Sequence, residues 1–117
     1  MELTLTVYTN TKLKEVENKY TVNDFELSTK ACEDLLNLIN IDMFEGGLEA
    51  LSEESRIIEI IKPMLNGRQV FYDIIKDVFD VNDDQLGRTK ISEILKCLAC
   101  IIKYSLTGLV STFKGKN

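Results

Sequence analysis

The chain has 117 residues, of which 44% are hydrophobic and 28% are charged, and its formal net charge is −5. This length and composition are typical of one folded domain with a modest core, which excludes disordered and fibrous proteins. The sequence contains no histidine. It therefore lacks the commonest general base and every Ser-His or Cys-His nucleophile, which argues against most hydrolytic enzymes.

The charge is unevenly distributed along the chain. Residues 1–87 hold 8 Lys and Arg against 18 Asp and Glu, whereas residues 88–117 hold 6 against 1. An acidic body repels the phosphates of nucleic acids, and the basic end is too dilute for a nucleic-acid-binding patch. The sequence shows neither a signal-peptide pattern nor an apolar run of about 18 residues. We therefore expect a cytoplasmic protein that binds neither nucleic acid nor membranes.

Two segments near the N-terminus alternate between apolar and polar residues. In ELTLTVYT, Leu3, Leu5 and Val7 share one face, and EVENKYTV over residues 15–22 alternates again. A period of two in strand-favouring residues predicts a β-hairpin over residues 1–22. An isolated hairpin is only marginally stable, so its apolar face must cover helices or another subunit.

After the hairpin the period changes to that of helices. Ser28 or Thr29 is expected to cap a first helix, and Ser52 a second helix that Pro63 kinks or ends. A third helix begins near Arg68 and has one apolar stripe, which predicts burial of that side. The stripe consists of Phe71, Ile74, Ile75, Val78 and Phe79.

The last helix is the clearest element of the sequence. Thr89 can cap it, and apolar residues recur at three- and four-residue steps from Lys90 to about Phe113. At about 1.5 Å per residue, the helix is roughly 35 Å long. We therefore predict a mainly α, α+β fold in one domain, residues 1–117. The hairpin of residues 1–22 precedes a bundle of about four helices in residues 23–117, and the last helix is long and central.

This last helix is apolar nearly all round. Its main stripe is centred on Ile91, Leu95, Leu98 and Ile102. A helix with two apolar sides is buried on more than one face. It is either the central helix of the core, or its second face meets a client protein or another copy of the chain. The candidate partner-binding residues are Cys97, Cys100 and Tyr104, opposite the stripe, and Leu106 and Val110, which flank it.

The stretch DVNDDQLGRTKI has the start of a calcium-binding loop. Asp80, Asn82 and Asp84 stand at positions one, three and five. Such a loop also needs a glycine at position six and a glutamate at position twelve, where this chain has Gln85 and Ile91. We therefore expect no metal here. The alternative is a joint between helices.

In that joint, Asn82 or Asp83 caps a short turn and Asp84 satisfies backbone donors. Gly87 then supplies a flexible link to the last helix.

Cys97 and Cys100 have the spacing of a redox or zinc motif. A redox pair normally lies at a helix N-terminus, whereas this pair lies in the middle of a helix among apolar residues. Zinc needs four ligands, and Cys32 is the only other cysteine. We therefore predict packing cysteines. No acid pair converges for catalysis, because adjacent acids on a helix point about 100° apart. We expect no catalytic residues and no cofactor.

Four segments of the C-terminal half follow one another in this order: VFYDIIKDVFD, VNDDQLGRTKISEIL, IIKYSLTGLVSTF and a final KGKN. Over about residues 68–117, the sequence resembles the tail assembly chaperones of long-tailed phages and prophages of low-GC Gram-positive bacteria. The N-terminal part agrees in outline, although its hairpin is longer than the resemblance implies.

The resemblance implies a small, mainly helical, non-catalytic protein of the host cytoplasm that is absent from the mature virion. Such chaperones bind the tape-measure protein and tail-tube subunits and keep them soluble until the tail polymerises. We therefore expect these two partners, with a homo-oligomer left open. The alternative is a small acidic regulatory or inhibitory protein of a phage or bacterium. Its contact surface is then residues 33–59, with eight acids and one arginine.

Overall fold

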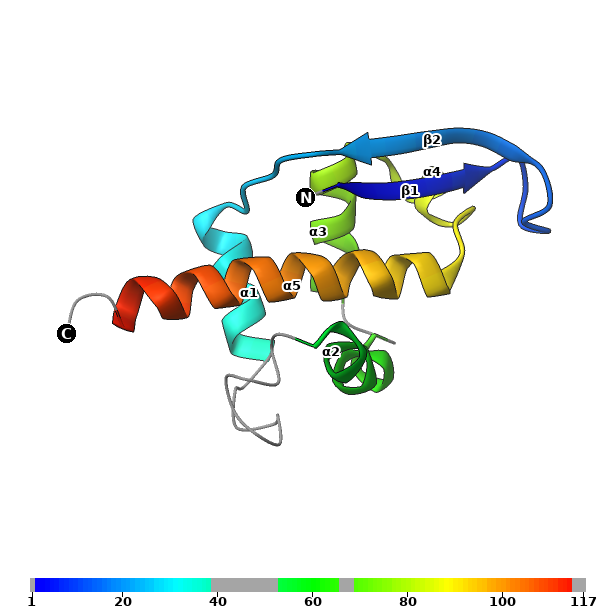
Figure 1. The fold of residues 1–117 in the computed structure, drawn as a ribbon. Coiled ribbons are helices and arrows are strands. Elements are labelled where there is room, and N and C mark those ends of the chain that lie inside the picture. The colour runs from blue at the N-terminus through cyan, green and yellow to red at the C-terminus, as the bar shows by residue number, and fades with distance from the viewer. Residues whose placement is uncertain (1, 39–52, 66–68, 115–117) are drawn as a thin grey trace.

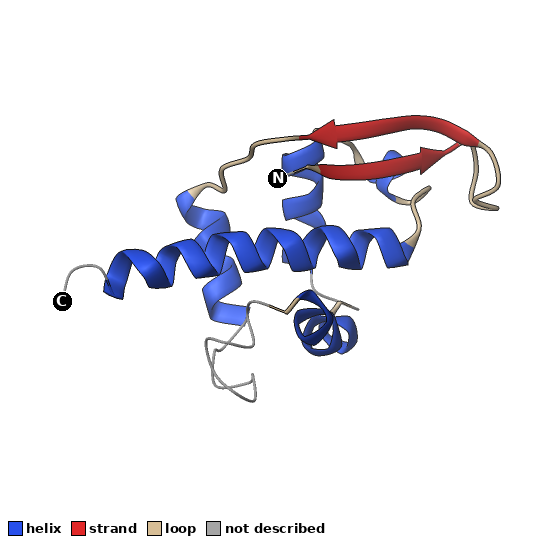
Figure 2. Ribbon diagram, viewed as in Figure 1, coloured by secondary structure: helices blue, strands red, loops and turns tan. Residues whose placement is uncertain are grey.

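The computed structural model describes residues 2–38, 53–65 and 69–114, except for the side chains of Leu36 and residues 106–114. Within these ranges, an N-terminal antiparallel hairpin precedes five α-helices, of which the last is long (Figures 1 and 2). The predicted fold class, mainly helical α+β, is confirmed. The elements are β1 (Leu3–Tyr8), β2 (Val16–Val22), α1 (Thr29–Leu38), α2 (Glu54–Ile61), the 3₁₀-helix η3 (Lys62–Met64), α3 (Gln69–Phe79), α4 (Asp83–Leu86) and α5 (Ile91–Lys114).

The apolar face of the hairpin packs onto the helices. Leu3, Leu5 and Val7 of β1 are buried, and Tyr20 and Val22 of β2 are partly buried against the same core. Leu3 pairs with Val22, and Leu5 pairs with Tyr20. Paired residues point to the same face of a sheet, so both strands present apolar side chains to one side. The prediction that the hairpin covers helices is confirmed.

The outer edge of β1 is covered by the first turn of α5 and by Arg88, which precedes this helix. In Figure 1, β1 lies between β2 and α5. The backbone N–H of Tyr8 donates to the carbonyl oxygen of Arg88 at 2.8 Å. The backbone N–H of Thr6 donates to the Glu93 carboxylate. Unpaired backbone groups along a strand edge favour aggregation, and these contacts satisfy two of them.

The middle helices begin and end near the predicted positions. The Ser28 hydroxyl accepts the backbone N–H of Ala31 at 3.1 Å and caps α1. Glu53 occupies the N-cap of α2 without a side-chain cap bond, and the expected cap Ser52 lies outside the described residues. Pro63 ends α2, because the chain continues from Ile61 as the 3₁₀-helix η3. The predicted stripe of α3 is also buried, with Val78 only partly so.

Helix α5 is the central helix of the core. It packs against α2, α3 and β1, so neighbours cover both its main stripe and part of the opposite side. This confirms the alternative in which α5 is the central helix of the core, for the part of the helix whose side chains are described. Its buried residues are Ile94, Leu95, Cys97, Leu98, Ala99, Ile101 and Ile102.

Ile91 departs from the expected stripe, because 55% of it is exposed. It lies on the first turn of α5, beyond the contacts that bury the middle of the helix. There it borders a surface hollow of about 350 Å³, together with Tyr72 of α3 and Leu86 of α4. The helical period correctly places Ile91 on the same side of α5 as Leu95. It does not reveal where along the helix the packing against other elements ends.

The molecule is elongated, with extents of 50 × 26 × 22 Å. Figure 1 shows the last turns of α5 extending past α1, away from the hairpin turn. In the part of the chain that the structure describes, none of the helices has the length and apolar character needed to cross a membrane.

Candidate functional site

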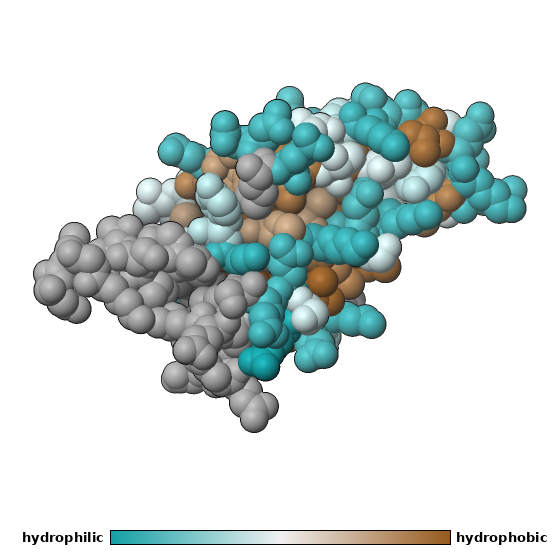
Figure 3. Space-filling view, viewed as in Figure 1, coloured by the Kyte–Doolittle hydropathy of each residue, from teal (hydrophilic) through white to brown (hydrophobic). Residues whose placement is uncertain are grey.

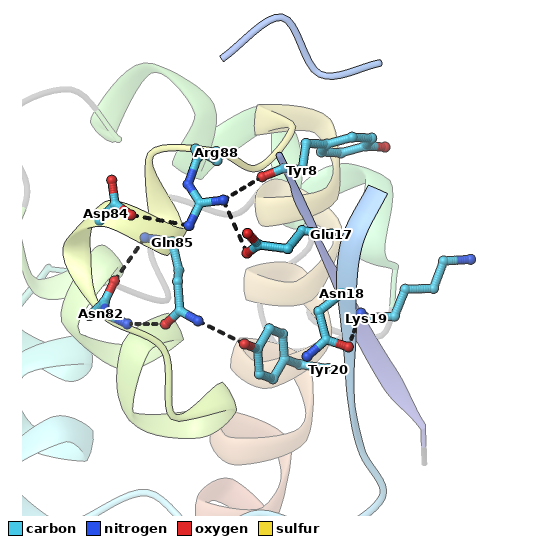
Figure 4. A network of polar contacts seen from close by, with 9 residues as sticks. All are labelled: Tyr8, Glu17, Asn18, Lys19, Tyr20, Asn82, Asp84, Gln85 and Arg88. Carbon is cyan, nitrogen blue, oxygen red and sulfur yellow. Dashed lines mark hydrogen bonds and ion pairs between the residues drawn. The ribbon is translucent and has the colours of Figure 1, made fainter. Parts of the chain in front are cut away.

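The stretch with a partial calcium pattern forms a capped helical turn. Asn82 occupies the N-cap of α4, and its side-chain oxygen accepts the backbone N–H of Gln85 at 2.8 Å. The Gln85 side chain in turn accepts the backbone N–H of Asn82 at 2.9 Å. It also donates to the Tyr20 hydroxyl of β2 at 2.7 Å. The predicted Asn82 cap is confirmed. Figure 4 shows that the Gln85 side chain, which takes part in the cap, also contacts the hairpin.

Arg88 joins the hairpin to this turn, as Figure 4 shows. Its guanidinium donates to the Tyr8 carbonyl oxygen at 2.7 Å and pairs with Glu17 at 3.1 Å and Asp84 at 3.1 Å. Glu17 and then Asp84 raise the pKa of Arg88. Asp84 thus binds a side chain, whereas we predicted that it satisfies backbone donors. The arginine, which the sequence reasoning did not single out, is the centre of this network.

Two side chains of the partial calcium pattern, Asn82 and Asp84, make contacts within the protein. Asn82 binds Gln85, Asp84 binds Arg88, and Asp80 has a positive φ of 55° directly after α3. Within the described ranges, no group of three or more Cys, Asp or Glu side chains is placed to hold a metal ion. Thr89 does not act as the expected cap of α5. Its hydroxyl donates instead to the Leu86 carbonyl oxygen at 2.7 Å.

The capping interaction gives the first testable prediction. Asn82→Ala is expected to lower the free energy of unfolding by about 1 kcal/mol, because the backbone N–H of Gln85 loses its side-chain acceptor. Asn23→Ala is the matched control, since Asn23 is exposed and no hydrogen bond is seen for its side chain in the described part of the chain. Urea denaturation followed by circular dichroism measures both. Equal effects of the two variants would contradict the capping role.

The two cysteines of α5 are packing residues, as predicted. The Cys97 thiol is buried and donates to the Thr4 carbonyl oxygen of β1 at 3.5 Å. Burial raises its pKa to about 12. The half-buried Cys100 thiol donates to the Glu54 carboxylate at 3.3 Å. Burial and then Glu54 raise its pKa to about 11. Both sulfurs stay protonated at neutral pH, and a thiol is a weak nucleophile and metal ligand.

The structure separates the candidate partner-binding residues. Cys97 faces β1, whereas Cys100 faces α2, so a partner can reach Cys97 only if the hairpin leaves α5. Tyr104 is 62% exposed, and its ring centroid lies 6.0 Å from that of Phe25. Leu106 and Val110 lie on the helical backbone of α5, but their side chains lie outside the described residues. Of the five residues, the structure describes Tyr104 as exposed, Cys100 as half-buried and Cys97 as buried.

The acidic segment of the alternative hypothesis, residues 33–59, is described only in part, because residues 39–52 lie outside the described ranges. Three of its described acids are paired. Asp34 pairs with Lys30 at 3.0 Å, Glu53 with Arg56 at 3.0 Å, and Glu54 with Lys103 at 3.9 Å. Intramolecular pairing reduces the charge that the described part of this segment can offer to a partner.

The sequence reasoning missed a groove between α1 and α3. Two adjoining hollows of about 330 and 260 Å³ share four lining residues, namely Ser28, Ala31, Ile74 and Asp77. We call them together the α1–α3 groove. Its larger hollow also has apolar walls from Phe25, Leu27 and Val78, and acids from Asp24 and Glu26. In the sequence DFEL, acids alternate with apolar residues, and this pattern indicates a segment with one acidic and one apolar side. The pattern does not reveal that α1 and α3 form the rest of the groove.

No protein-family model, curated protein or solved structure matches this chain. The candidate site therefore rests on the chain's own geometry. It comprises Tyr104, the C-terminal turns of α5 and the α1–α3 groove, whose residue Phe25 lies beside Tyr104.

Proposed function

We propose that this chain is a non-catalytic phage tail assembly chaperone of the host cytoplasm. It binds the tape-measure and tail-tube proteins before the tail polymerises, and it is not retained in the mature virion. One observation carries the proposal. Ile102 is the last residue of α5 that is described as buried, Tyr104 is 62% exposed, and the backbone stays helical to Lys114. The sequence of residues 106–114 is rich in apolar residues.

A helix with an exposed aromatic residue and an apolar sequence in its last turns suits the capture of another protein's apolar surface. The rest of the molecule suits the second task of a chaperone, which is to keep the complex soluble. The chain has a net charge of −5. On the face that Figure 3 shows, hydrophilic residues cover most of the described surface. Charged surfaces of this kind resist aggregation.

The test is co-purification with the tape-measure protein. We expect a stable complex with the unaltered chain and at least a tenfold loss of affinity for Leu106→Asp or Tyr104→Asp, because a charge in an apolar contact costs more than about 1.4 kcal/mol. Ile91→Asp is the matched control, since Ile91 is an exposed apolar residue at the other end of α5. Thermal unfolding by circular dichroism must show that all variants are folded. If neither the tape-measure protein nor the tail-tube protein binds the unaltered chain, the proposal fails.

A further inference from the structure

The turn of the hairpin carries an apolar residue between two lysines. Lys12 and Lys14 are exposed and form no ion pair within the described part of the chain. Leu13 has a positive φ of 57°, a conformation that glycine adopts readily and that costs other residues free energy. Leu13 is only half-buried, and among the described residues it does not belong to the hydrophobic core. Packing within the chain therefore does not account for this leucine. We call residues 12–14 the hairpin tip.

One end of the α1–α3 groove has the opposite charge. Asp24, Glu26 and Asp77 are exposed, line the larger hollow of about 330 Å³, and make no ion pair or hydrogen bond within the described ranges. The walls between them are apolar and include Phe25 and Val78. An apolar hollow with three free carboxylates complements the hairpin tip in both hydrophobicity and charge.

A chain cannot place the hairpin tip in its own hollow, because β2 separates the two. Lys14 lies two residues before β2, and Asp24 lies two residues after it. The strand has 7 residues, which span about 23 Å at about 3.3 Å per residue. Figure 1 shows the hairpin turn and the loop after β2 at opposite ends of this strand. Only another copy can therefore bring a hairpin tip to this hollow.

The positions of the two features suit a symmetric exchange. The middle of β2 is six residues from Leu13 and six residues from Phe25. When a second copy runs antiparallel beside β2, each tip therefore lies level with the hollow of the other copy. The outer edge of β2 has no strand beside it in the described part of the chain, and residues 16–19 are exposed. Backbone pairing of the two β2 strands is not required, and the Asn18 side chain already accepts the backbone N–H of Lys19.

We infer that two copies of this chain form a symmetric dimer in which each copy places its hairpin tip in the larger hollow of the α1–α3 groove of the other. A two-fold axis near the middle of β2 relates the two contacts and closes the assembly at two copies. Leu13 then meets the apolar walls of the hollow, and the two lysines meet the three carboxylates.

The test is a charge exchange measured by sedimentation velocity at low salt. One variant reverses the tip (Lys12→Glu, Lys14→Glu), and another reverses the hollow (Asp24→Lys, Glu26→Lys, Asp77→Lys). We expect a dimer for the unaltered chain and at least a tenfold weaker dimer for each variant alone. An equal mixture of the two variants should recover the dimer, because each reversed tip then meets a reversed hollow and each unaltered tip an unaltered hollow. This recovery also shows that both variants fold.

Leu13→Gly separates docking from a structural role of the leucine. Glycine accepts the left-handed conformation without strain, so we expect the chain to stay folded by circular dichroism. The dimer should weaken at least tenfold, because the apolar contact is lost. The matched control for the tip variant is Lys62→Glu with Lys96→Glu, since both lysines are exposed and the change in net charge is the same. We expect this control to stay dimeric.

A monomeric unaltered chain, an assembly larger than a dimer, a dimer that tolerates either reversal alone, or a mixture that stays monomeric each overturns the inference. The dimer does not depend on the proposed chaperone function. A dimer that does not bind the tape-measure protein contradicts only that function, and a monomer that binds it contradicts only the dimer.

Discussion

Replacing Leu98 by alanine is expected to lower the free energy of unfolding by about 3 kcal/mol, which is near the middle of the range for a buried leucine. Leu98 is 0% exposed and lies midway along the buried part of α5, which packs against α2, α3 and β1. Elements on several sides limit how far the cavity can collapse, so we do not expect the loss to fall to the lower end of that range. Urea denaturation followed by far-ultraviolet circular dichroism measures the change.

Ile91→Ala is the control for this experiment. It removes a similar number of methyl and methylene groups from the same helix, at a position that is 55% exposed. We expect a loss below about 1 kcal/mol, because most of the side chain is already in water. Similar losses at Leu98 and Ile91 would contradict the central position of α5.

The main elements could be predicted from the sequence because each has a clear period. The alternation of Leu3, Leu5 and Val7 defines β1, and the apolar steps between Ile94 and Ile102 define the buried part of α5. Pro63 and Asn82 act locally, through a missing N–H group and a short polar side chain. Their effects therefore need no knowledge of the rest of the fold.

The environment of the second face of α5 could not be predicted in the same way. The period shows that Cys97 and Cys100 lie away from the main stripe, but it does not show which elements cover them. In the structure, β1 covers Cys97 and α2 approaches Cys100. Both contacts join segments more than 40 residues apart. A second apolar face on a helix therefore indicates that this face is buried. Only the tertiary structure shows which element of the protein, or which partner, covers it.

The candidate groove depends even more on tertiary structure. Its walls come from the loop before α1, from α1 itself and from α3. The acids Asp24 and Asp77 line the same hollow although they are far apart in the sequence. Arg88 is a similar case, because its partners Tyr8 and Glu17 belong to the hairpin. Residues that join distant segments give no local signal.

Replacing Glu93 by alanine is expected to lower the free energy of unfolding by about 1–3 kcal/mol, the cost of leaving a buried donor unpaired. The Glu93 carboxylate accepts the backbone N–H of Thr6 and, at 3.2 Å, the Thr6 hydroxyl. Thr6 is only 6% exposed, so water has little access to the freed groups. The measurement is again urea denaturation, with hydrogen exchange at Thr6 as a local readout.

Glu93→Gln separates this hydrogen bond from the charge. A glutamine keeps a side-chain oxygen that can accept the Thr6 N–H, so most of the stability and the slow exchange at Thr6 should be retained. If neither substitution changes the stability or the exchange at Thr6, the Thr6 contact does not hold β1 on α5. The burial of Leu3 and Leu5 and the contacts of Arg88 and Gln85 then anchor the hairpin. If only alanine fails, α5 also protects the outer edge of β1, since the freed Thr6 N–H is then open to pairing with a strand of another chain.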